Sequence, residues 1–230
     1  MFFPFYYDPT YILLIPALIL AIYAQGKVQG TFQRYLREYS QVGMTGAQVA
    51  RALLDANGLH DVPVEMTRGV LSDHYDPRTK RMRLSPQVYN STSVAALGVA
   101  AHETGHAVQH SQAYIPLNIR NNLYPVASIG SQMAFPLFFI GFLTWSQTLM
   151  SVAIWLFIGA LAFQLVTLPV EFNASRRALA MLEGGGFLTR TEIPKAKQVL
   201  DAAALTYVAA AAMAALQLLR LLVLRGARDD

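Results

Sequence analysis

The sequence predicts a predominantly α-helical integral membrane protein with a small β-sheet beside one helix that carries polar residues. Three observations support this fold class. The 230 residues are 54% hydrophobic and only 14% charged, whereas about a quarter of the residues in a soluble domain are charged. The apolar residues gather in four long runs, and a helix of about 20 apolar residues can cross a bilayer. Between the first two runs lies a segment in which apolar and charged residues alternate, as is typical of strands.

Each of the four predicted membrane spans is a run without a charged residue. The runs cover residues 10–24, 123–143, 149–170 and 202–219. The first run is short and contains Pro16, and the sequence leaves open whether the last one crosses the bilayer completely. No Lys or Arg precedes the first run, so we expect a retained anchor and not a signal peptide. No linker or repeat divides the chain, which predicts a single domain over residues 1–230.

The positive charges predict the orientation in the membrane. Of the eighteen Lys and Arg residues, ten lie in residues 25–121, five in residues 171–201 and none in residues 144–148. The positive-inside rule therefore places the first two segments in the cytoplasm. The remaining three Lys and Arg residues, from Arg220 onward, oppose this predicted orientation. Because basic residues beside membrane spans explain the net charge of +4, the lipid bilayer is an expected partner and nucleic acid is not.

The segment between the first two runs predicts two helices that flank a small sheet. Thr45 and Gln48 fit a capping box at the start of the first helix. Residues 62–66 alternate and predict a strand, and residues 69–85 predict two extended pieces around a turn. The second helix is expected to begin near residues 90–93, which are rich in capping residues, and to end near residue 111.

That second helix carries a His-Glu-x-x-His motif in His102, Glu103 and His106. Positions i and i+4 share one helix face, so both imidazoles can bind one zinc ion at about 2.0–2.1 Å. Glu103 borders the metal and can act as a general base toward zinc-activated water. With five His and six Glu in the chain, about 0.003 such motifs are expected by chance. We therefore predict one zinc ion per chain.

A catalytic zinc ion needs a third protein ligand and leaves its fourth position to water. Glu171 is the expected third ligand, because it follows an apolar run and shares a helix face with small and apolar residues, which should bury its carboxylate. Two predicted spans separate it from His106, so both lie on one side of the membrane. His110 is a minor alternative. It lies eight residues beyond His102 on the same helix, a rise of about 12 Å, which is too far for both to bind one zinc ion in a tetrahedron. Glu183, Glu192 and Asp201 also qualify by side, but none lies so close to a face expected to be buried. The longer metzincin pattern fails, because Gln109 and Gln112 replace its glycine and third histidine.

Three segments, residues 72–109, 168–178 and 202–210, resemble the YugP-like neutral zinc metallopeptidases of bacterial membranes. More distantly, the His-Glu-x-x-His motif with Glu-x-x-Ala is similar to the HtpX and CAAX prenyl protease group of gluzincins. The resemblance implies a zincin-like catalytic core, with zinc bound by His102, His106 and Glu171 and with Glu103 as the base. The distant group usually has an aspartate four residues after the glutamate ligand, where this chain has Ser175. The open candidates for this supporting role are Asn173, His74 and Arg177, and His74 is also a candidate for the oxyanion.

The sequence therefore predicts a zinc-dependent membrane endopeptidase that hydrolyses peptide bonds of membrane or membrane-proximal proteins. We expect a multi-pass protein of the bacterial inner membrane whose catalytic face is cytoplasmic. The alternative is a non-catalytic, zinc-stabilised scaffold or adaptor, which would need no base such as Glu103 and would close the fourth zinc position. A transporter is disfavoured, because the chain has no inverted repeat and no charge within its middle spans.

The basic residues of the sheet segment have more than one interpretation. They are Arg78, Lys80, Arg81 and Arg83. They could bind anionic lipid headgroups, or they could protect an exposed sheet edge from pairing. A third possibility is that an edge strand at residues 80–84 receives a substrate segment by strand addition.

Overall fold

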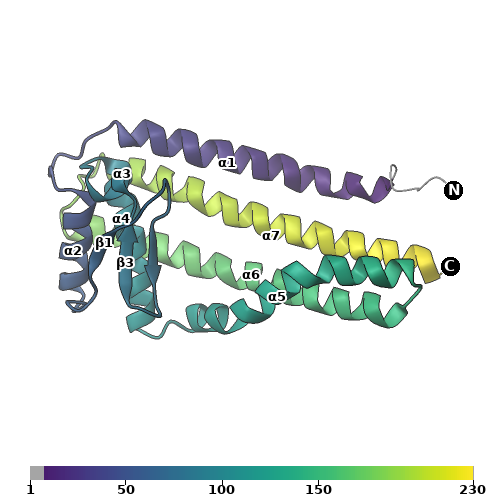
Figure 1. The fold of residues 1–230 in the computed structure, drawn as a ribbon. Helices are drawn as coiled ribbons and strands as arrows, with labels where there is room; N and C mark the ends of the chain where they lie inside the picture. The colour runs from purple at the N-terminus through teal and green to yellow at the C-terminus, as the bar shows by residue number, and fades with distance from the viewer. Residues whose placement is uncertain (1–7, 230) are drawn as a thin grey trace. The chain divides into compact units, whose positions relative to one another are not determined.

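The computed structural model describes residues 8–229, with side chains as far as residue 227, and confirms a mainly α-helical chain with a small sheet (Figure 1). The helices are the 3₁₀ helix η2 (Pro9–Leu14) and the α-helices α1 (Ile15–Leu36), α2 (Gly46–Ala56), α3 (Pro86–Tyr89), α4 (Val94–Ser111), α5 (Ile115–Leu143), α6 (Gln147–Gly184) and α7 (Ile193–Asp229). The strands are β1 (Val64–Met66), β2 (His74–Asp76) and β3 (Arg81–Leu84).

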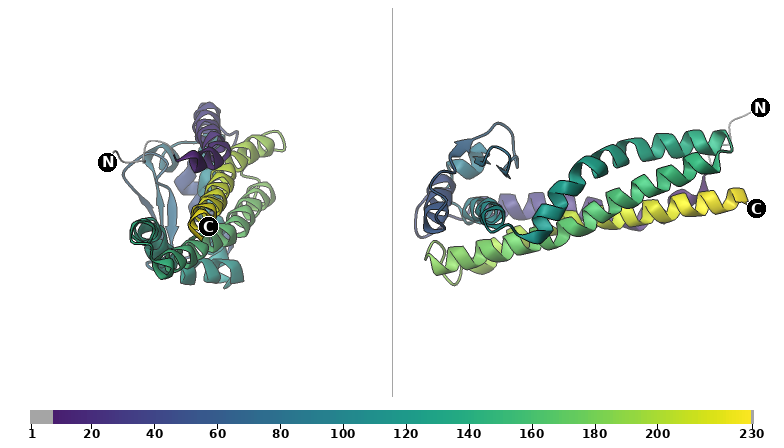
Figure 2. Two further views of the ribbon diagram at one scale, coloured as in Figure 1. Left: turned by 90° about the vertical axis from the view of Figure 1, so that its right-hand side faces the viewer. Right: turned by 90° about the horizontal axis from the view of Figure 1, so that it is seen from below.

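Four helical segments of the described chain are long and apolar enough to cross a membrane. They are Pro9–Leu36, Ile115–Leu143, Gln147–Gly184 and Ile193–Ala227, and each contains one of the predicted runs. Pro16 does not interrupt the first segment, since it lies in the first turn of α1, where a missing N–H costs no helical hydrogen bond. Pro125 and Pro136 lie inside α5, which curves along its length (Figure 2), as expected where proline removes helical hydrogen bonds.

The chain divides into two compact units. Unit 1 comprises Met1–Ala24, Ile119–Leu168 and Thr206–Asp230, and unit 2 comprises Gln25–Asn118 and Pro169–Leu205. The predicted metal ligands therefore all belong to unit 2, whereas the middle of each long apolar segment belongs to unit 1. That the whole chain acts as one domain stays a prediction.

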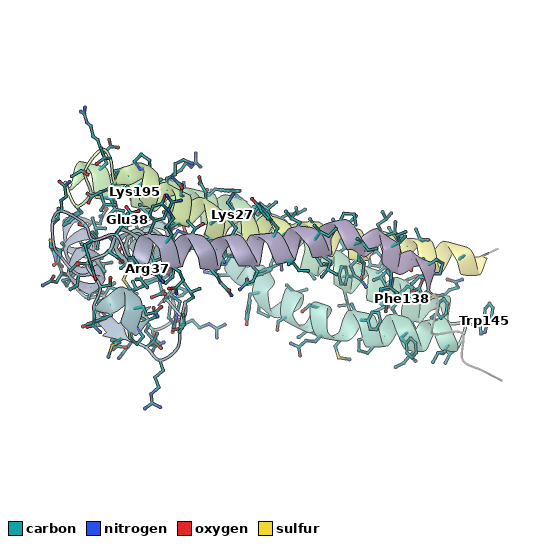
Figure 3. The ribbon with its side chains drawn as sticks, turned by 90° about the horizontal axis from the view of Figure 1, so that it is seen from above. Lys27, Arg37, Glu38, Phe138, Trp145 and Lys195 are labelled. Atoms are coloured by element: carbon teal, nitrogen blue, oxygen red, sulfur yellow. The ribbon has the colours of Figure 1, made fainter. Side chains whose placement is uncertain are left out.

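Unit 1 is held by apolar contacts and by one buried ion pair. Its core contains Phe138, which Figure 3 labels, together with Met150 and Leu221. Arg220 is buried, binds the Asp8 carboxylate and donates from Nε to Thr10 Oγ1 at 3.0 Å. One of the three positive charges that opposed the predicted orientation is therefore neutralised within the protein.

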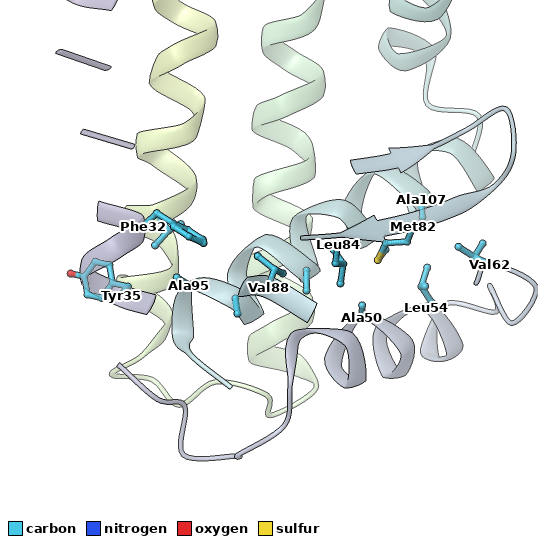
Figure 4. Packing of buried hydrophobic residues seen from close by; sticks show 13 residues of the cluster. Phe32, Tyr35, Ala50, Leu54, Val62, Met82, Leu84, Val88, Ala95 and Ala107 are labelled. Carbon is cyan, nitrogen blue, oxygen red and sulfur yellow. The ribbon is translucent and has the colours of Figure 1, made fainter. Parts of the chain in front are cut away.

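Unit 2 is built around the sheet and α4. Strand β3 lies between β1, to which it is parallel, and β2, to which it is antiparallel. Met82 and Leu84 of β3 point into a core with Leu54 of α2 (Figure 4). Since β3 is the central strand, the expectation that residues 80–84 form an edge strand was wrong. The free edges belong to β1 and β2.

Two of the four basic residues named in the sheet segment, Arg81 and Arg83, are paired within the sheet. Arg81 and Arg83 alternate with the buried Met82 and Leu84, as predicted, and both form ion pairs with Glu65 of β1. Because these two charges are paired within the sheet, they favour neither a lipid-binding role nor protection of a free edge.

The helices that flank the sheet begin where the sequence predicted. Thr45 forms the predicted capping box with Gln48 at the start of α2, and Ser93 caps α4 through the N–H of Ala96. The start of α7 is tied to the end of α1 by an ion pair between Lys195 and Glu38, whose side chains lie next to each other in Figure 3. These anchors fix α4 within unit 2.

Candidate metal centre

Small residues let α4 pack with its backbone against α6. At Gly105, an added Cβ atom would lie 2.7 Å from the carbonyl oxygen of Ala174, which is closer than such atoms approach each other. Ala174 and Ala178 on the facing side of α6 are fully buried. The run of small residues around the motif is therefore what allows the two backbones to touch. On α4, Gly105 lies between His102 and His106. On α6, Ala174 lies three residues beyond Glu171. The two histidines and the glutamate therefore meet at this crossing.

The crossing brings together the three side chains that the sequence predicted as metal ligands. Nε2 of His102 and Nε2 of His106 are 3.1 Å apart. Oε2 of Glu171 lies 3.3 Å from the first nitrogen and 3.6 Å from the second. Ligands at about 2.0–2.2 Å from a tetrahedral zinc ion are separated by about 3.3–3.6 Å, so the three atoms fit three corners of a zinc tetrahedron. In the described part of the chain, this is the group of His and carboxylate side chains that could hold a metal ion.

The second nitrogen of each histidine is also bound, which orients both rings. Nδ1 of His102 lies 3.2 Å from Oγ of Ser175, and Nδ1 of His106 lies 3.0 Å from Oε1 of Gln109. The Gln109 amide nitrogen donates to the carbonyl of Val170 at 2.8 Å and to Oδ1 of Asn173 at 2.9 Å. Because the amide oxygen of Gln109 can only accept, His106 carries its proton on Nδ1 and directs the lone pair of Nε2 toward the metal position.

A chain of side-chain hydrogen bonds extends this support to α6. Arg177 donates from Nε to Oδ1 of Asn173 at 2.8 Å and from Nη1 to Oε1 of Gln112 at 2.8 Å. Asn173 and Arg177, two of the candidates for the supporting role, therefore act on His106 through Gln109. Ser175, where the distant group has an aspartate, itself contacts His102.

Sequence reasoning missed Gln109, which it used only to reject the metzincin pattern. The side chain is fully buried and lies three residues after His106, on the same helix face. A polar amide at that spacing beside a metal ligand is a signal that could have been recognised.

The remaining histidines and carboxylates do not join the cluster. His74 is exposed, and its Nδ1 lies 2.8 Å from the carbonyl oxygen of Ser72. His110 lies 3.0 Å from the hydroxyl of Tyr75 through its own Nδ1. Glu183 and Asp201, two other candidates, are exposed. The carboxylate of Glu192 accepts hydrogen bonds from the main-chain N–H groups of residues 41 and 189.

Glu103 is buried beside the cluster, with 8% of its surface exposed. Its Oε2 accepts a hydrogen bond of 2.9 Å from the main-chain N–H of Tyr75 in β2. Burial raises the pKa of the nearby Asp73 carboxyl, and the charge of Glu103 raises it further, although hydrogen bonds from Ser85 oppose both effects. The base predicted from the motif is thus held by strand β2 and lies on the helix that also carries His102 and His106.

Comparison with known proteins agrees with this geometry. A family model described as "Putative neutral zinc metallopeptidase" matches residues 10–226. The chain belongs to this family. It is also 47% identical over 219 residues to the "Putative membrane protease YugP" of Bacillus subtilis (strain 168), which covers 95% of this chain and 97% of that protein. No solved structure matches the chain. The resemblance found in the sequence is confirmed, and the family description implies zinc.

The cluster predicts the metal content of the purified protein. We expect one zinc ion per chain, most of which is lost when either His102 or His106 is replaced by Ala, because two ligands are too few to retain it. His60→Ala is the matched control, since His60 is exposed and pairs with Asp55. Elemental analysis measures the zinc in each variant. Full zinc content in both ligand variants would contradict the assignment.

The close crossing of α4 and α6 predicts that Gly105→Ala weakens zinc binding. The methyl group would push against the Ala174 carbonyl, and overpacking of this kind costs about 1–3 kcal/mol, so we expect zinc affinity to fall by about tenfold. Gly98→Ala on the same helix is the control, because its methyl group would meet Ala196 at an ordinary 3.5 Å. Competition with a chelator measures both affinities. Equal affinities for the two variants would show that the crossing does not set the ligand positions.

Proposed function

We propose that this chain is a zinc-dependent membrane endopeptidase that hydrolyses peptide bonds of membrane or membrane-proximal proteins. The observation that carries this proposal is the convergence of His102, His106 and Glu171 at 3.1–3.6 Å, with the buried carboxylate of Glu103 beside them. The proposed ligand set is two neutral imidazoles and one carboxylate. Membership in a zinc metallopeptidase family supports the same reading.

The chemistry divides between the metal and Glu103. Zinc in such a site acts as a Lewis acid that polarises a carbonyl group and makes water more acidic. Glu103 accepts the proton from the water that attacks the peptide carbonyl, and it then donates this proton to the leaving amine. One oxygen of Glu103 is held by the Tyr75 N–H, which leaves the other oxygen to carry the proton.

The same geometry favours a peptidase over the zinc-stabilised scaffold. A structural zinc site is closed by four protein ligands, whereas a catalytic site has three. The cluster found among the described residues supplies three. A scaffold would also have no use for Glu103, and burial of a carboxylate is costly.

The sheet suggests where an extended substrate would lie. Strand β2 is at the edge of the sheet and borders Glu103 through Tyr75. Because the Tyr75 N–H is already donated to Glu103, a peptide segment that adds to β2 would pair with the other main-chain groups of this strand. We therefore propose β2, in place of residues 80–84, as the strand beside which a substrate segment would lie.

We further propose that the metal centre faces the cytoplasm of the bacterial inner membrane. Fifteen of the eighteen Lys and Arg residues lie in residues 25–121 and 171–201, and Arg220, one of the other three, is neutralised by Asp8. Four crossing segments would also place both chain ends on one side, which agrees with the contact between Asp8 and Arg220.

Two glutamates with different roles give the test of the proposed function. Glu103→Gln cannot accept a proton, so it should keep zinc while peptide cleavage falls by at least about 10²–10⁴. Glu171→Gln should lose zinc first, and excess zinc should restore part of its activity. Glu183→Gln, an exposed change on the same helix as Glu171, is the control. Zinc content and cleavage of peptides are measured in detergent for all three. Near-normal cleavage by Glu103→Gln would exclude the proposed mechanism.

The orientation is tested with single cysteines, since the chain contains none of its own. Asp61 and Arg190 are exposed residues of unit 2, and Trp145, which is 71% exposed, lies between α5 and α6. In intact cells, a membrane-impermeant thiol reagent should label a cysteine at position 145 and should not label one at position 61 or 190. Labelling of only one of the last two would separate His106 and Glu171 by the membrane and would rule out their shared site.

A further inference from the structure

Tyr75 of β2 contacts α4 at two points. Its main-chain N–H donates to Oε2 of Glu103 at 2.9 Å, and its hydroxyl lies 3.0 Å from Nδ1 of His110. The Tyr75 and His110 rings also touch, with their centroids 5.8 Å apart. A single residue of the sheet thus contacts both the predicted base and a histidine outside the cluster of predicted metal ligands.

The two contacted residues lie on one face of α4. Glu103 and His110 are seven residues apart, which is about two turns and about 10.5 Å along the helix axis. Tyr75 therefore lies along this face, with its backbone at one end and its phenol at the other. A contact at two separated points restricts rotation and sliding of the strand, whereas a contact at one point would not.

The rest of the hairpin makes Tyr75 a fixed anchor. Tyr75 is paired with Met82 of the central strand, and the side chain of Met82 is fully buried. Asp73, at the start of β2, accepts from the N–H of Ser85 at 2.7 Å and from its hydroxyl at 3.1 Å. Burial raises the pKa of the Tyr75 phenol, so the hydroxyl stays protonated at neutral pH and can donate to Nδ1 of His110.

We propose that Tyr75 and His110 are positioning residues that hold the Glu103 carboxylate in the orientation for proton transfer. The Tyr75 N–H binds one carboxylate oxygen, and the hydroxyl bond to His110 keeps β2 seated on α4 so that the N–H stays in place. Without the second bond, the strand and the carboxylate gain freedom, and fewer molecules have the base aligned with the attacking water. This inference rests on the proposed function for the role of Glu103 and adds the residues that orient it.

The first arm of the test needs no catalysis. Hydrogen–deuterium exchange, read at single-residue resolution on zinc-loaded protein, measures how often the amide at position 75 is released from Glu103. We expect exchange at this amide to rise at least about fivefold in Tyr75→Phe and in His110→Ala, because each loses one hydrogen bond. The control is Tyr35→Phe, which removes another tyrosine hydroxyl of unit 2 that donates to Gln198 at 2.8 Å. Unchanged exchange in Tyr75→Phe and His110→Ala would overturn the proposal, whatever the activity of the protein.

The second arm measures kcat and KM with a peptide substrate. Tyr75→Phe and His110→Ala should each lower kcat by about 3- to 10-fold, while KM and zinc content remain those of Tyr35→Phe. The double variant should resemble either single variant, since both changes break the same bond. His110→Asn should recover most of the loss, because its amide places a polar atom where Nδ1 lies.

The outcomes separate this inference from the proposed function. Additive effects, a loss of zinc, or a rise in KM without a fall in kcat would overturn the positioning role and leave the peptidase proposal standing. If the wild-type protein cleaves no peptide but exchange at position 75 responds as expected, the hydrogen-bond arrangement is right and the endopeptidase proposal is wrong.

Discussion

The metal centre depends on the close approach of α4 and α6. The contact at Gly105 and Ala174 leaves no room for a side chain, and it lies beside the motif histidines and Glu171. A wider separation would move the glutamate oxygen away from the two imidazole nitrogens, and the ligand distances would no longer match a zinc tetrahedron. Packing of small residues is therefore a condition for the chemistry as well as for the fold. It also explains why a helix with so many alanines carries three ionisable groups within five residues.

Burial of these groups requires that their polar atoms be satisfied. Gln109 meets this requirement for His106, and it is in turn held by the Val170 carbonyl and by Asn173. The bonds from Gln109 to Val170 and Asn173 join α4 to α6, so the network that orients the ring also strengthens the crossing. Glu103 is held in a different way, by a main-chain N–H of the sheet. The ligands thus depend on a helix pair, whereas the base depends on the contact between sheet and helix.

Whether a feature of this structure could be predicted from the sequence depends on how far apart along the chain the interacting residues lie. The capping box at Thr45, the limits of α4 and the motif itself are local patterns, and the sequence was sufficient for them. Glu171 could be predicted as the third ligand because two predicted spans separate it from His106. Both residues are then expected on the same side of the membrane, and Glu171 also follows an apolar run. The central position of β3 could not be predicted, because it depends on the parallel pairing of Val64 with Met82, and no local pattern distinguishes a central strand from an edge in so short a sheet. Tyr75 was missed for the same reason, since its partners Glu103 and His110 lie far along the chain, whereas the spacing of Gln109 from His106 was a local signal.

The continuity of α6 bears on which substrates the proposed enzyme can reach. The apolar run of residues 149–170 and Glu171 belong to one helix, which contains Pro169, so a predicted metal ligand follows a candidate membrane span without a linker. If that run crosses the bilayer as proposed, Glu171 comes one residue after its end, so this predicted ligand cannot lie far from the membrane surface, since one residue spans at most about 3.6 Å. Peptide bonds close to that surface would reach the site, whereas a bond exposed far from the membrane would have to be brought to it. The proposed preference for membrane and membrane-proximal substrates thus rests on where Glu171 lies in its helix, independently of any side-chain specificity of the site.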